Sequence, residues 1–373
     1  MLNFRHVELL RQTLICALVA LFFSLVPGHS AVAVEVPTLY TAQVPWDKIA
    51  DGSREEAYKT ALIEVLARVS GSELSADPDS VDALFPRPQD YVTQFRPDAL
   101  DTLWVTFDGQ AIERVLRSSG ETVWGRERPL TLIWLAVDWG QGDREIIAAG
   151  EPERTQQEGR SIDRNRLLRE RLLDIAQKRG LPVAFPLLDT TDLQGVSFSD
   201  IWGGFDDRVV DASRRYDADS ILIGRIRSTG SQLNRWTYRF GPETRTWSGP
   251  PETVIARIAD LLAAEFAVGG NAPLEMLELN VSGVQSVDAY GSVQAMLSDL
   301  SVIENFKITA VSGDTVRYAI EVRGGAERLR RALRFAGLLE AETGPATLGF
   351  DATPTLDFFY EKRDSSTRPS NVF

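Results

Sequence analysis

The sequence of 373 residues is almost free of cysteine and histidine. Its one cysteine is Cys16 and its two histidines are His6 and His29, so all three lie within residues 1–33. If that segment is removed on export, the mature chain contains neither residue type. Such a chain has no Ser-His-Asp triad, no cysteine nucleophile, no disulfide bond and no His/Cys zinc site. The chemistry left open is carboxylate catalysis, Ser-Lys catalysis and oxygen-ligated cations.

Recognisable catalytic motifs are missing as well. Lysine is scarce, with 5 residues against 35 arginines, and no Ser-x-x-Lys pattern occurs. The sequence also lacks Gly-x-Ser-x-Gly, a P-loop, G-x-G-x-x-G and an EF-hand loop. We therefore assign no catalytic residue, no metal site and no cofactor, and we favour a protein that is not an enzyme. The formal net charge of −13 argues against a nucleic-acid partner and against electrostatic docking on an anionic membrane.

The N-terminal segment has the three parts of a secretory signal. Arg5 and Arg11 precede an uncharged apolar run of 14 residues, Thr13–Val26, and Ala31-Val32-Ala33 offers a small-x-small cleavage site. A bilayer span needs about 20 apolar residues, so the run is short for a membrane helix. We predict a cleaved signal peptide over residues 1–33 and a soluble periplasmic protein with no membrane span. The alternative is an uncleaved signal that anchors the protein in the inner membrane.

The length and the hydrophobic patterns predict three modules of α/β and α+β class. We place an N-terminal α+β module at 37–126, a central α/β module at 128–270 and a ferredoxin-like module at 272–360, followed by a disordered tail at 361–373. The run LTLIWLAV at 130–137 is typical of a strand buried on both faces. It predicts a three-layer central module with a mainly parallel sheet. The last module has the element order βαββαβ.

Local patterns place the elements of each module. In the first module we expect a strand at 39–44, a helix from a Ser53–Glu56 capping box, two short helices in a Pro-rich stretch with Phe95 facing inward, and a helix capped by Asp108. In the central module we expect strands and helices to alternate, with a mobile polar loop at 141–159 and an antiparallel hairpin of 220–227 with 232–240.

The candidate site lies at the carboxyl ends of the central strands, where ligands bind in open α/β sheets. The side chains expected to converge there, as ligand-binding or partner-binding residues, are Asp189, Asp200, Trp202, Asp206 and Arg225. A carboxylate pair beside an aromatic ring is what a glycan-processing or glycan-binding site uses. The alternative is structural: Asp200 and Asp206 cap helices, Trp202 belongs to the core and Arg225 pairs locally.

Three stretches carry a resemblance to a known family. They are LYTAQVPW with SREEAYKTALIEVLARVSG, then LPVAFPLLDTTD with SDIWGGF and DASRRYDADSILIGRI, and then LELNVSGVQSVDAYGSVQAMLSDL. Together they resemble the exported proteobacterial family of unknown function numbered two thousand and sixty-six. More distantly, the first helix is similar to a module of flagellar T-ring proteins, and the central module is similar to the N-terminal domain of the TolB translocation protein. These resemblances imply an envelope assembly and transfer no catalytic residue.

We therefore predict a non-enzymatic periplasmic binding or scaffold protein of a cell-envelope assembly, with envelope proteins as partners. One alternative is a carboxylate-dependent glycan-processing enzyme, which needs two acidic groups about 5–10 Å apart in one cleft. Another is a periplasmic solute-binding protein, which needs a deep pocket between the central and the last module.

Overall fold

The computed structural model describes residues 34–36, 38–47, 53–71, 78–98, 101–150, 159–227, 234–341 and 354–361. The predicted signal peptide, and the predicted tail beyond Glu361, lie outside these residues. Contacts divide the chain into two units, Met1–Ser30 and Ala31–Phe373, and the fold below is that of the second. Within the described ranges, no helix combines the length and the apolar character that a membrane span requires. The fold is mixed α/β, as the sequence predicts.

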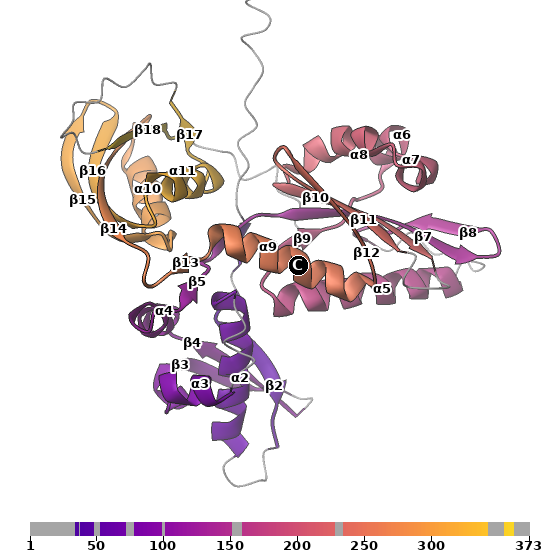
Figure 1. Cartoon of the computed structure of the whole chain (residues 1–373), viewed down its shortest axis with the longest axis horizontal. Helices are drawn as coiled ribbons and strands as arrows, with labels where there is room; N and C mark the ends of the chain where they lie inside the picture. Colours follow the sequence, from indigo (N-terminus) through magenta and orange to yellow (C-terminus); the bar gives the residue numbers. More distant parts are fainter. Residues whose placement is uncertain are drawn as a thin grey trace, which may run out of the picture. The chain divides into compact units, whose positions relative to one another are not determined.

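The first module is a three-stranded sheet, in the order β2-β4-β3, packed on one long helix (Figure 1). Alternate residues of β2 and β4 are buried, and helix α2 covers them with an apolar stripe that includes Leu62 and Leu66. Asp108 caps α4 as expected, because its side chain accepts a hydrogen bond from the Ala111 N–H at 3.0 Å. The elements are β1 (Val34–Glu35), β2 (Thr41–Pro45), α2 (Ser53–Val69), α3 (Pro78–Leu84), η2 (Pro88–Tyr91), β3 (Val92–Pro97), β4 (Thr102–Phe107), α4 (Gly109–Ser118), β5 (Thr122–Val123) and β6 (Glu127–Arg128).

The Pro-rich stretch of this module differs in part from expectation. It contains the two short helices, α3 and η2, but the chain then continues as the edge strand β3. β-Branched Val92 and Thr93 favour a strand, and Pro97 is tolerated because β3 lies at the edge of the sheet. Phe95 does not face inward as predicted: it is 48% exposed and meets Tyr58 only edge-on, with ring centroids 6.0 Å apart.

The central module is the predicted three-layer structure. Strand β7 is buried on both faces, and its side chains alternate between two cores. Ile133 and Leu135 share a core with residues of helices α5 and α9, whereas Leu132 and Trp134 share one with residues of α7 and α8. The two pairs of helices lie on opposite faces of the sheet (Figure 1). The elements are β7 (Thr131–Gly140), β8 (Asp143–Ile146), α5 (Gly159–Lys178), β9 (Val183–Ala184), α6 (Thr190–Gly195), α7 (Phe198–Gly203), α8 (Asp206–Ser213), η3 (Arg214–Tyr216), β10 (Ser220–Arg227), β11 (Arg235–Phe240), β12 (Glu243–Ser248) and α9 (Pro251–Phe266).

The central sheet is mixed rather than mainly parallel. Its order is β12-β11-β10-β7-β8, with β9 also paired to β7. The β10–β7 and β7–β9 pairs are parallel, whereas β11, β12 and β8 each add through an antiparallel pair. Strand β8 lies in the stretch predicted as a loop. It forms because Gly140 and Gly142, both with positive φ, permit a tight turn that folds the chain back on β7.

The last module follows the expected βαββαβ order with one insertion. Its sheet order is β15-β16-β14-β18-β17, and buried residues of β14 and β16 pack against α10 and α11. The insertion is the short strand β17, which follows α11 and pairs antiparallel with β18. Strand β18 in turn pairs parallel with β14. The elements are β13 (Val268–Gly269), β14 (Leu274–Ser282), α10 (Val287–Asp299), β15 (Ile303–Ser312), β16 (Thr315–Arg323), α11 (Ala326–Phe335), β17 (Leu339–Glu340) and β18 (Thr355–Phe359).

A buried arginine connects the first module to the central one. Arg128 is fully buried, and its guanidinium lies 4.0 Å from the centroid of the Trp124 ring. It donates hydrogen bonds to main-chain carbonyl oxygens at the ends of two helices, Arg68 at the end of α2 and Gly180 just after α5, each at 2.8 Å. These helix C-termini carry partial negative charge, which stabilises the cation without a carboxylate. Burial nevertheless lowers the pKa of Arg128 to about 9.

Candidate functional site

The strongest candidate site is a cavity of about 370 Å³ at the carboxyl end of β10. The described residues that line it are Trp202, Arg225, Arg227 and Arg235, and we call it the arginine pocket. Arg225 and Arg227 are alternate residues of β10, so they lie on the same face of the strand. Arg235 begins β11 and pairs directly with Arg225 in the antiparallel register. The sheet thus brings three guanidinium groups and an indole together.

Arg225 is held on two sides by the α7–α8 segment. Its Nε donates to the Ile201 carbonyl oxygen at 2.7 Å, and its Nη2 donates to Asp206 Oδ1 at 3.0 Å. Gly204 ends α7 with φ of 81° and lies so close that a Cβ there would be 3.3 Å from Arg225 Nη2. The guanidinium is therefore fixed in position before any ligand binds.

Arg227 and Trp202 belong to a column of stacked groups. The Trp202 ring stacks on Phe198 with centroids 5.2 Å apart and an interplanar angle of 21°. The Arg227 guanidinium lies 5.4 Å from the Trp202 centroid, and Arg144 lies 5.9 Å from that of Phe198. Cation–π attraction in this column restrains Arg227 without neutralising its charge.

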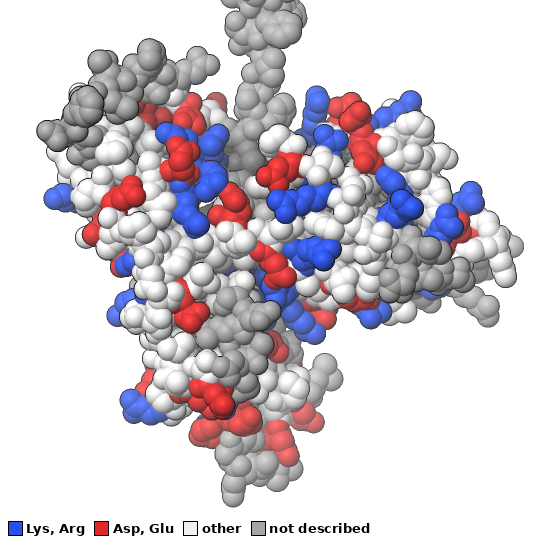
Figure 2. All heavy atoms as spheres, viewed as in Figure 1, with Lys and Arg blue, Asp and Glu red and all other residues white. Residues whose placement is uncertain are grey.

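The arginine pocket has an excess of positive charge. Asp206 pairs with Arg225, but the part of the chain that the structure describes places no carboxylate within ion-pair distance of Arg227 or Arg235. Asp138 lies opposite Arg227 on β7 but pairs with Arg144, so these two charges cancel. The local charge of the three arginines and Asp206 is therefore +2, in a chain whose formal net charge is −13. On the face drawn in Figure 2, basic and acidic side chains are interspersed.

The predicted site residues divide into two groups. Trp202, Asp206 and Arg225 lie together at the arginine pocket. Asp200 lies on the same helix as Trp202 but forms a capping box with Ser197, and this hydrogen bonding lowers the pKa of its carboxyl. The N-cap of α7 is Ser197, and Asp200 is the third helical residue of the capping box, so its role is structural although it is not the cap that the structural alternative predicts. Asp206 is the first residue of α8 rather than its cap, and Arg225 pairs with it locally, as that alternative predicts.

Asp189 lies in a different cluster. It caps α6, and both of its oxygens accept hydrogen bonds from Arg215, at 2.7 and 2.8 Å, which hold the pKa of Asp189 well below its usual range. Arg215 also contacts the fully buried Asp192 at 3.1 Å, and the Tyr216 hydroxyl donates to Asp192. Asp192 in turn accepts the Leu188 N–H at 2.9 Å, where the backbone has a positive φ of 53°. This cluster fixes the chain after β9 rather than presenting a free carboxylate pair.

Arg227 and Arg235 line the pocket but are not among the predicted site residues. Both lie in predicted strands, 220–227 and 232–240. The sequence does not give the register of this hairpin, and the register decides which residue lies opposite Arg225. That register pairs Arg225 with Arg235 and Gly224 with Trp236. Trp236 is 1% exposed and packs on the α9 side of the sheet, so its sequence neighbour Arg235 faces the opposite side. In the sequence, Arg235 precedes the apolar residues Trp236 and Tyr238, which are two positions apart. This pattern indicates that Arg235 lies on the face of β11 opposite to them.

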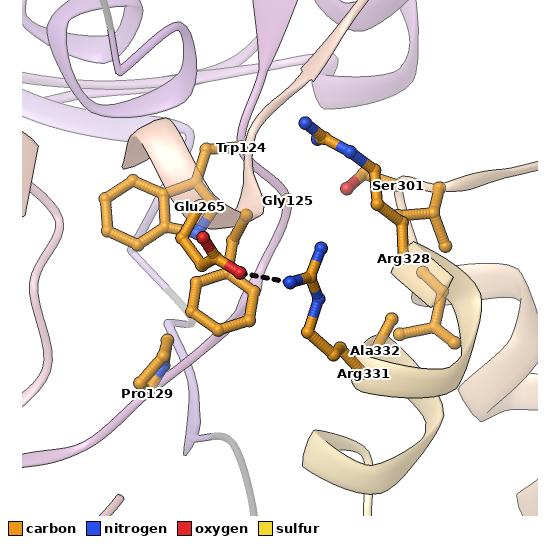
Figure 3. A pocket seen from close by; sticks show the side chains of 11 residues that line it. Trp124, Gly125, Pro129, Glu265, Ser301, Arg328, Arg331 and Ala332 are labelled. Atoms are coloured by element: carbon orange, nitrogen blue, oxygen red, sulfur yellow. Dashed lines mark hydrogen bonds and ion pairs between the residues drawn. The ribbon is translucent and has the colours of Figure 1, made fainter. Parts of the chain in front are cut away.

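A second cavity, of about 40 Å³, lies between the C-terminal end of α9 and the side of α11 (Figure 3). Arg331 forms an ion pair with Glu265 across it, and Arg328 donates to the Ala267 carbonyl oxygen at 2.7 Å. The Trp124 Nε1 is buried there without a hydrogen-bond partner among the described residues. The volume suits a few water molecules and is far below the 300–1,000 Å³ typical of ligand pockets.

Comparison with known proteins leaves the function open. A family model described as a domain of unknown function, DUF8605, matches residues 33–125. That range is the first module, so the arginine pocket lies outside the match. No curated protein and no solved structure matches the chain. Among the described residues, no group of His, Cys, Asp and Glu is arranged to hold a metal ion.

Proposed function

We propose that the chain is an exported, non-enzymatic binding protein of a cell-envelope assembly, and that the arginine pocket is the site where it recognises an anionic group. The observation that carries this proposal is the convergence of Arg225, Arg227 and Arg235 on one cavity with a single carboxylate partner. Arginine is the side chain best suited to bind carboxylate and phosphate groups, because its planar donors match their oxygens.

The geometry favours binding over glycan processing. A glycosidase needs two carboxyl groups across one cleft, and one of them acts as a general acid with a raised pKa. The described lining of the pocket is basic and aromatic. The acids beside the pocket are already engaged: Asp206 by Arg225, Asp200 by the capping box, which lowers the pKa of its carboxyl, and Asp138 by Arg144.

The solute-binding alternative is less well supported in the form predicted from the sequence. It requires a deep pocket between the central and last modules, and the cavity near α9 and α11 measures only about 40 Å³. A small anionic solute in the arginine pocket is a variant of the present proposal.

The proposed location in the cell envelope rests on the signal-like pattern of residues 1–33 and on the resemblance to an exported family.

The test is a crosslinking capture of the tagged, signal-bearing chain from its own envelope, with mass spectrometry of the captured proteins. The wild type is compared with the double variant Arg227→Ala/Arg235→Ala and with the control Arg214→Ala, which removes an exposed arginine of the same module. The proposal is supported if the wild type and the control capture the same set of envelope proteins and the double variant does not. Empty captures under conditions that trap a known periplasmic complex contradict the envelope assembly.

Anion binding is tested separately with purified protein. Sulfate is titrated against chloride at constant ionic strength while thermal unfolding is followed. A ligand that binds only the folded protein raises its stability. Sulfate should therefore stabilise the wild type and the control, and should have no specific effect on the double variant. Equal stabilisation of all three proteins would remove the arginine pocket as the anion site.

A further inference from the structure

We infer that the arginine pocket recognises the doubly charged phosphoryl group of a phosphate monoester, with Trp202 beside the organic part of the ligand. This inference rests on the proposed anion-binding function and adds the chemical class of the ligand.

The charge of the pocket favours a dianion. Three arginines and Asp206 give a local charge of +2, which a carboxylate or a sulfate ester with one negative charge neutralises only in part. A phosphate monoester carries about −1.5 to −2 charges at pH 7. It also offers three terminal oxygens, whereas a carboxylate offers two and is satisfied by one bidentate arginine.

The guanidinium groups of the pocket have more hydrogen-bond donors than the described protein acceptors use. An arginine has five N–H donors. Arg225 directs Nε and Nη2 to protein acceptors, at Ile201 and Asp206. Arg227 is held by stacking on Trp202 and not by a carboxylate of the described residues. Within the described residues, Arg227 and Arg235 therefore keep their guanidinium donors for the oxygens of a ligand, and Arg225 is held in place by Ile201 and Asp206.

The cavity is larger than a phosphate group. At about 370 Å³ it reaches the lower range of pockets for small organic molecules. Trp202 is half-buried, with Phe198 stacked on the ring and Arg227 above it, so that the organic part would lie along the indole edge. A soluble phosphate ester and a phosphorylated lipid headgroup share this chemistry, and the experiment distinguishes them.

The deciding experiment uses calorimetry on the mature chain with three probes that share a ring: phenyl phosphate, phenyl sulfate and benzoate. The second pKa of a phosphate monoester is about 6, so the dianion fraction rises roughly tenfold from about pH 5 to about pH 7.5. Phenyl phosphate should bind up to about tenfold more tightly at the higher pH. The affinities for phenyl sulfate and benzoate, which stay monoanions, should not change.

Each acid near the pocket is held in an ion pair with an arginine. The acids near the pocket are Asp206, which pairs with Arg225, Asp200, which pairs with Arg208, and Asp138, which pairs with Arg144. Both histidines lie in residues 1–33, which the mature chain lacks. Burial raises the pKa of Asp219 to about 7, but this residue precedes the opposite end of β10. Asp219→Asn is measured in parallel, and the pH dependence of phenyl phosphate binding should persist in it.

Variants tie the effect to the pocket. Arg227→Gln and Arg235→Gln should each weaken phenyl phosphate binding at least tenfold at about pH 7.5, and the control Arg214→Gln should leave it unchanged. Equal affinity for phenyl sulfate and phenyl phosphate, or no pH dependence, would overturn the phosphate assignment and leave a general anion site. Failure of all three probes to bind would overturn the anion-binding function as well.

The source of the phosphate is resolved by co-sedimentation with phosphatidylcholine vesicles that contain or lack phosphatidic acid, a lipid phosphate monoester. A lipid headgroup is indicated if sedimentation requires phosphatidic acid, is lost in Arg227→Gln and is reversed by phenyl phosphate. Calorimetric binding without sedimentation indicates a soluble ester.

Discussion

Arg225 and Arg235 lie directly opposite each other across strands β10 and β11. Like charges in this position destabilise an antiparallel pair, and Asp206 compensates only Arg225. Arg227 adds a third positive charge two residues along the same face. The ligand-free protein therefore carries an electrostatic cost at this site. Binding sites commonly lower the stability of the ligand-free protein in this way.

The first prediction is that Arg235→Gln stabilises the ligand-free protein. Removing one of two opposed charges should raise the free energy of unfolding by about 0.5–1 kcal/mol at low salt. The gain should shrink as salt rises, because screening already weakens the repulsion in the wild type. Urea unfolding at two ionic strengths measures both effects.

Arg214→Gln is the matched control for this prediction. Arg214 is exposed and pairs with Asp211 at 2.9 Å, so its loss should leave stability unchanged or lower it by up to about 1 kcal/mol. A lower stability of Arg235→Gln than of the wild type at low salt would show that Arg235 has a compensating partner.

The second prediction concerns Arg128, which holds the ends of α2 and α5. Arg128→Met removes hydrogen bonds to buried carbonyl oxygens, including those of Arg68 and Gly180 at 2.8 Å. Because each unsatisfied buried group costs about 1–3 kcal/mol, the variant should lose at least about 3 kcal/mol of unfolding free energy. The control Arg171→Met breaks an exposed ion pair with Glu252 and should cost less than about 1 kcal/mol. Equal losses in the two variants would contradict the role of Arg128.

Much of the fold was predictable because it follows from strong local patterns. The apolar run of β7 predicted a strand buried on both faces, and the Asp108 cap predicted the start of α4. Strands β8 and β12 were missed because their residues are mostly polar and none of them is buried, so they carry no hydrophobic period. Their formation depends on the turns that precede them and on pairing with a stronger strand, which is a tertiary effect.

The site was predictable only in part, for a related reason. The rule that ligands bind at the carboxyl ends of strands drew attention to Trp202, Asp206 and Arg225, which do lie together. It also drew in Asp189, which belongs to the Arg215 cluster, because sequence order does not show which loops meet. Arg235 was missed because only the hairpin register places it opposite Arg225.

The third prediction concerns Asp219, whose Oδ1 is buried without a hydrogen-bond partner among the described residues. Burial raises its pKa from the ordinary value of 3.8 to about 7 in the folded protein. Between about pH 4 and pH 7 the folded state therefore holds a proton that the unfolded state has lost, so stability falls as the pH rises. A shift of this size corresponds to roughly 4 kcal/mol.

Asp219→Asn tests this directly. The amide is neutral at every pH and its oxygen can still accept the Leu130 N–H, which now donates to Asp219 Oδ2 at 2.6 Å. The variant should have about the wild-type stability near pH 4 and should exceed it increasingly up to about pH 8. Urea unfolding across that range provides the measurement. A constant difference between the two proteins would mean that Asp219 does not titrate there.

The last prediction concerns Gly204, which lies against the Arg225 guanidinium at the end of α7. Gly204→Ala places a Cβ 3.3 Å from Arg225 Nη2, and φ of 81° is unfavourable for alanine. We expect a loss of about 1–2 kcal/mol in stability from the backbone and, separately, weaker anion binding because Arg225 must move.

Gly142→Ala separates the two effects. Gly142 has a similar φ of 88°, but a Cβ there would have no atom within 4 Å. The control should lose comparable stability and keep the full affinity for phenyl phosphate. Anion binding that falls equally in both variants would trace to general destabilisation. A fall confined to Gly204→Ala would show that the end of α7 positions Arg225 for the ligand.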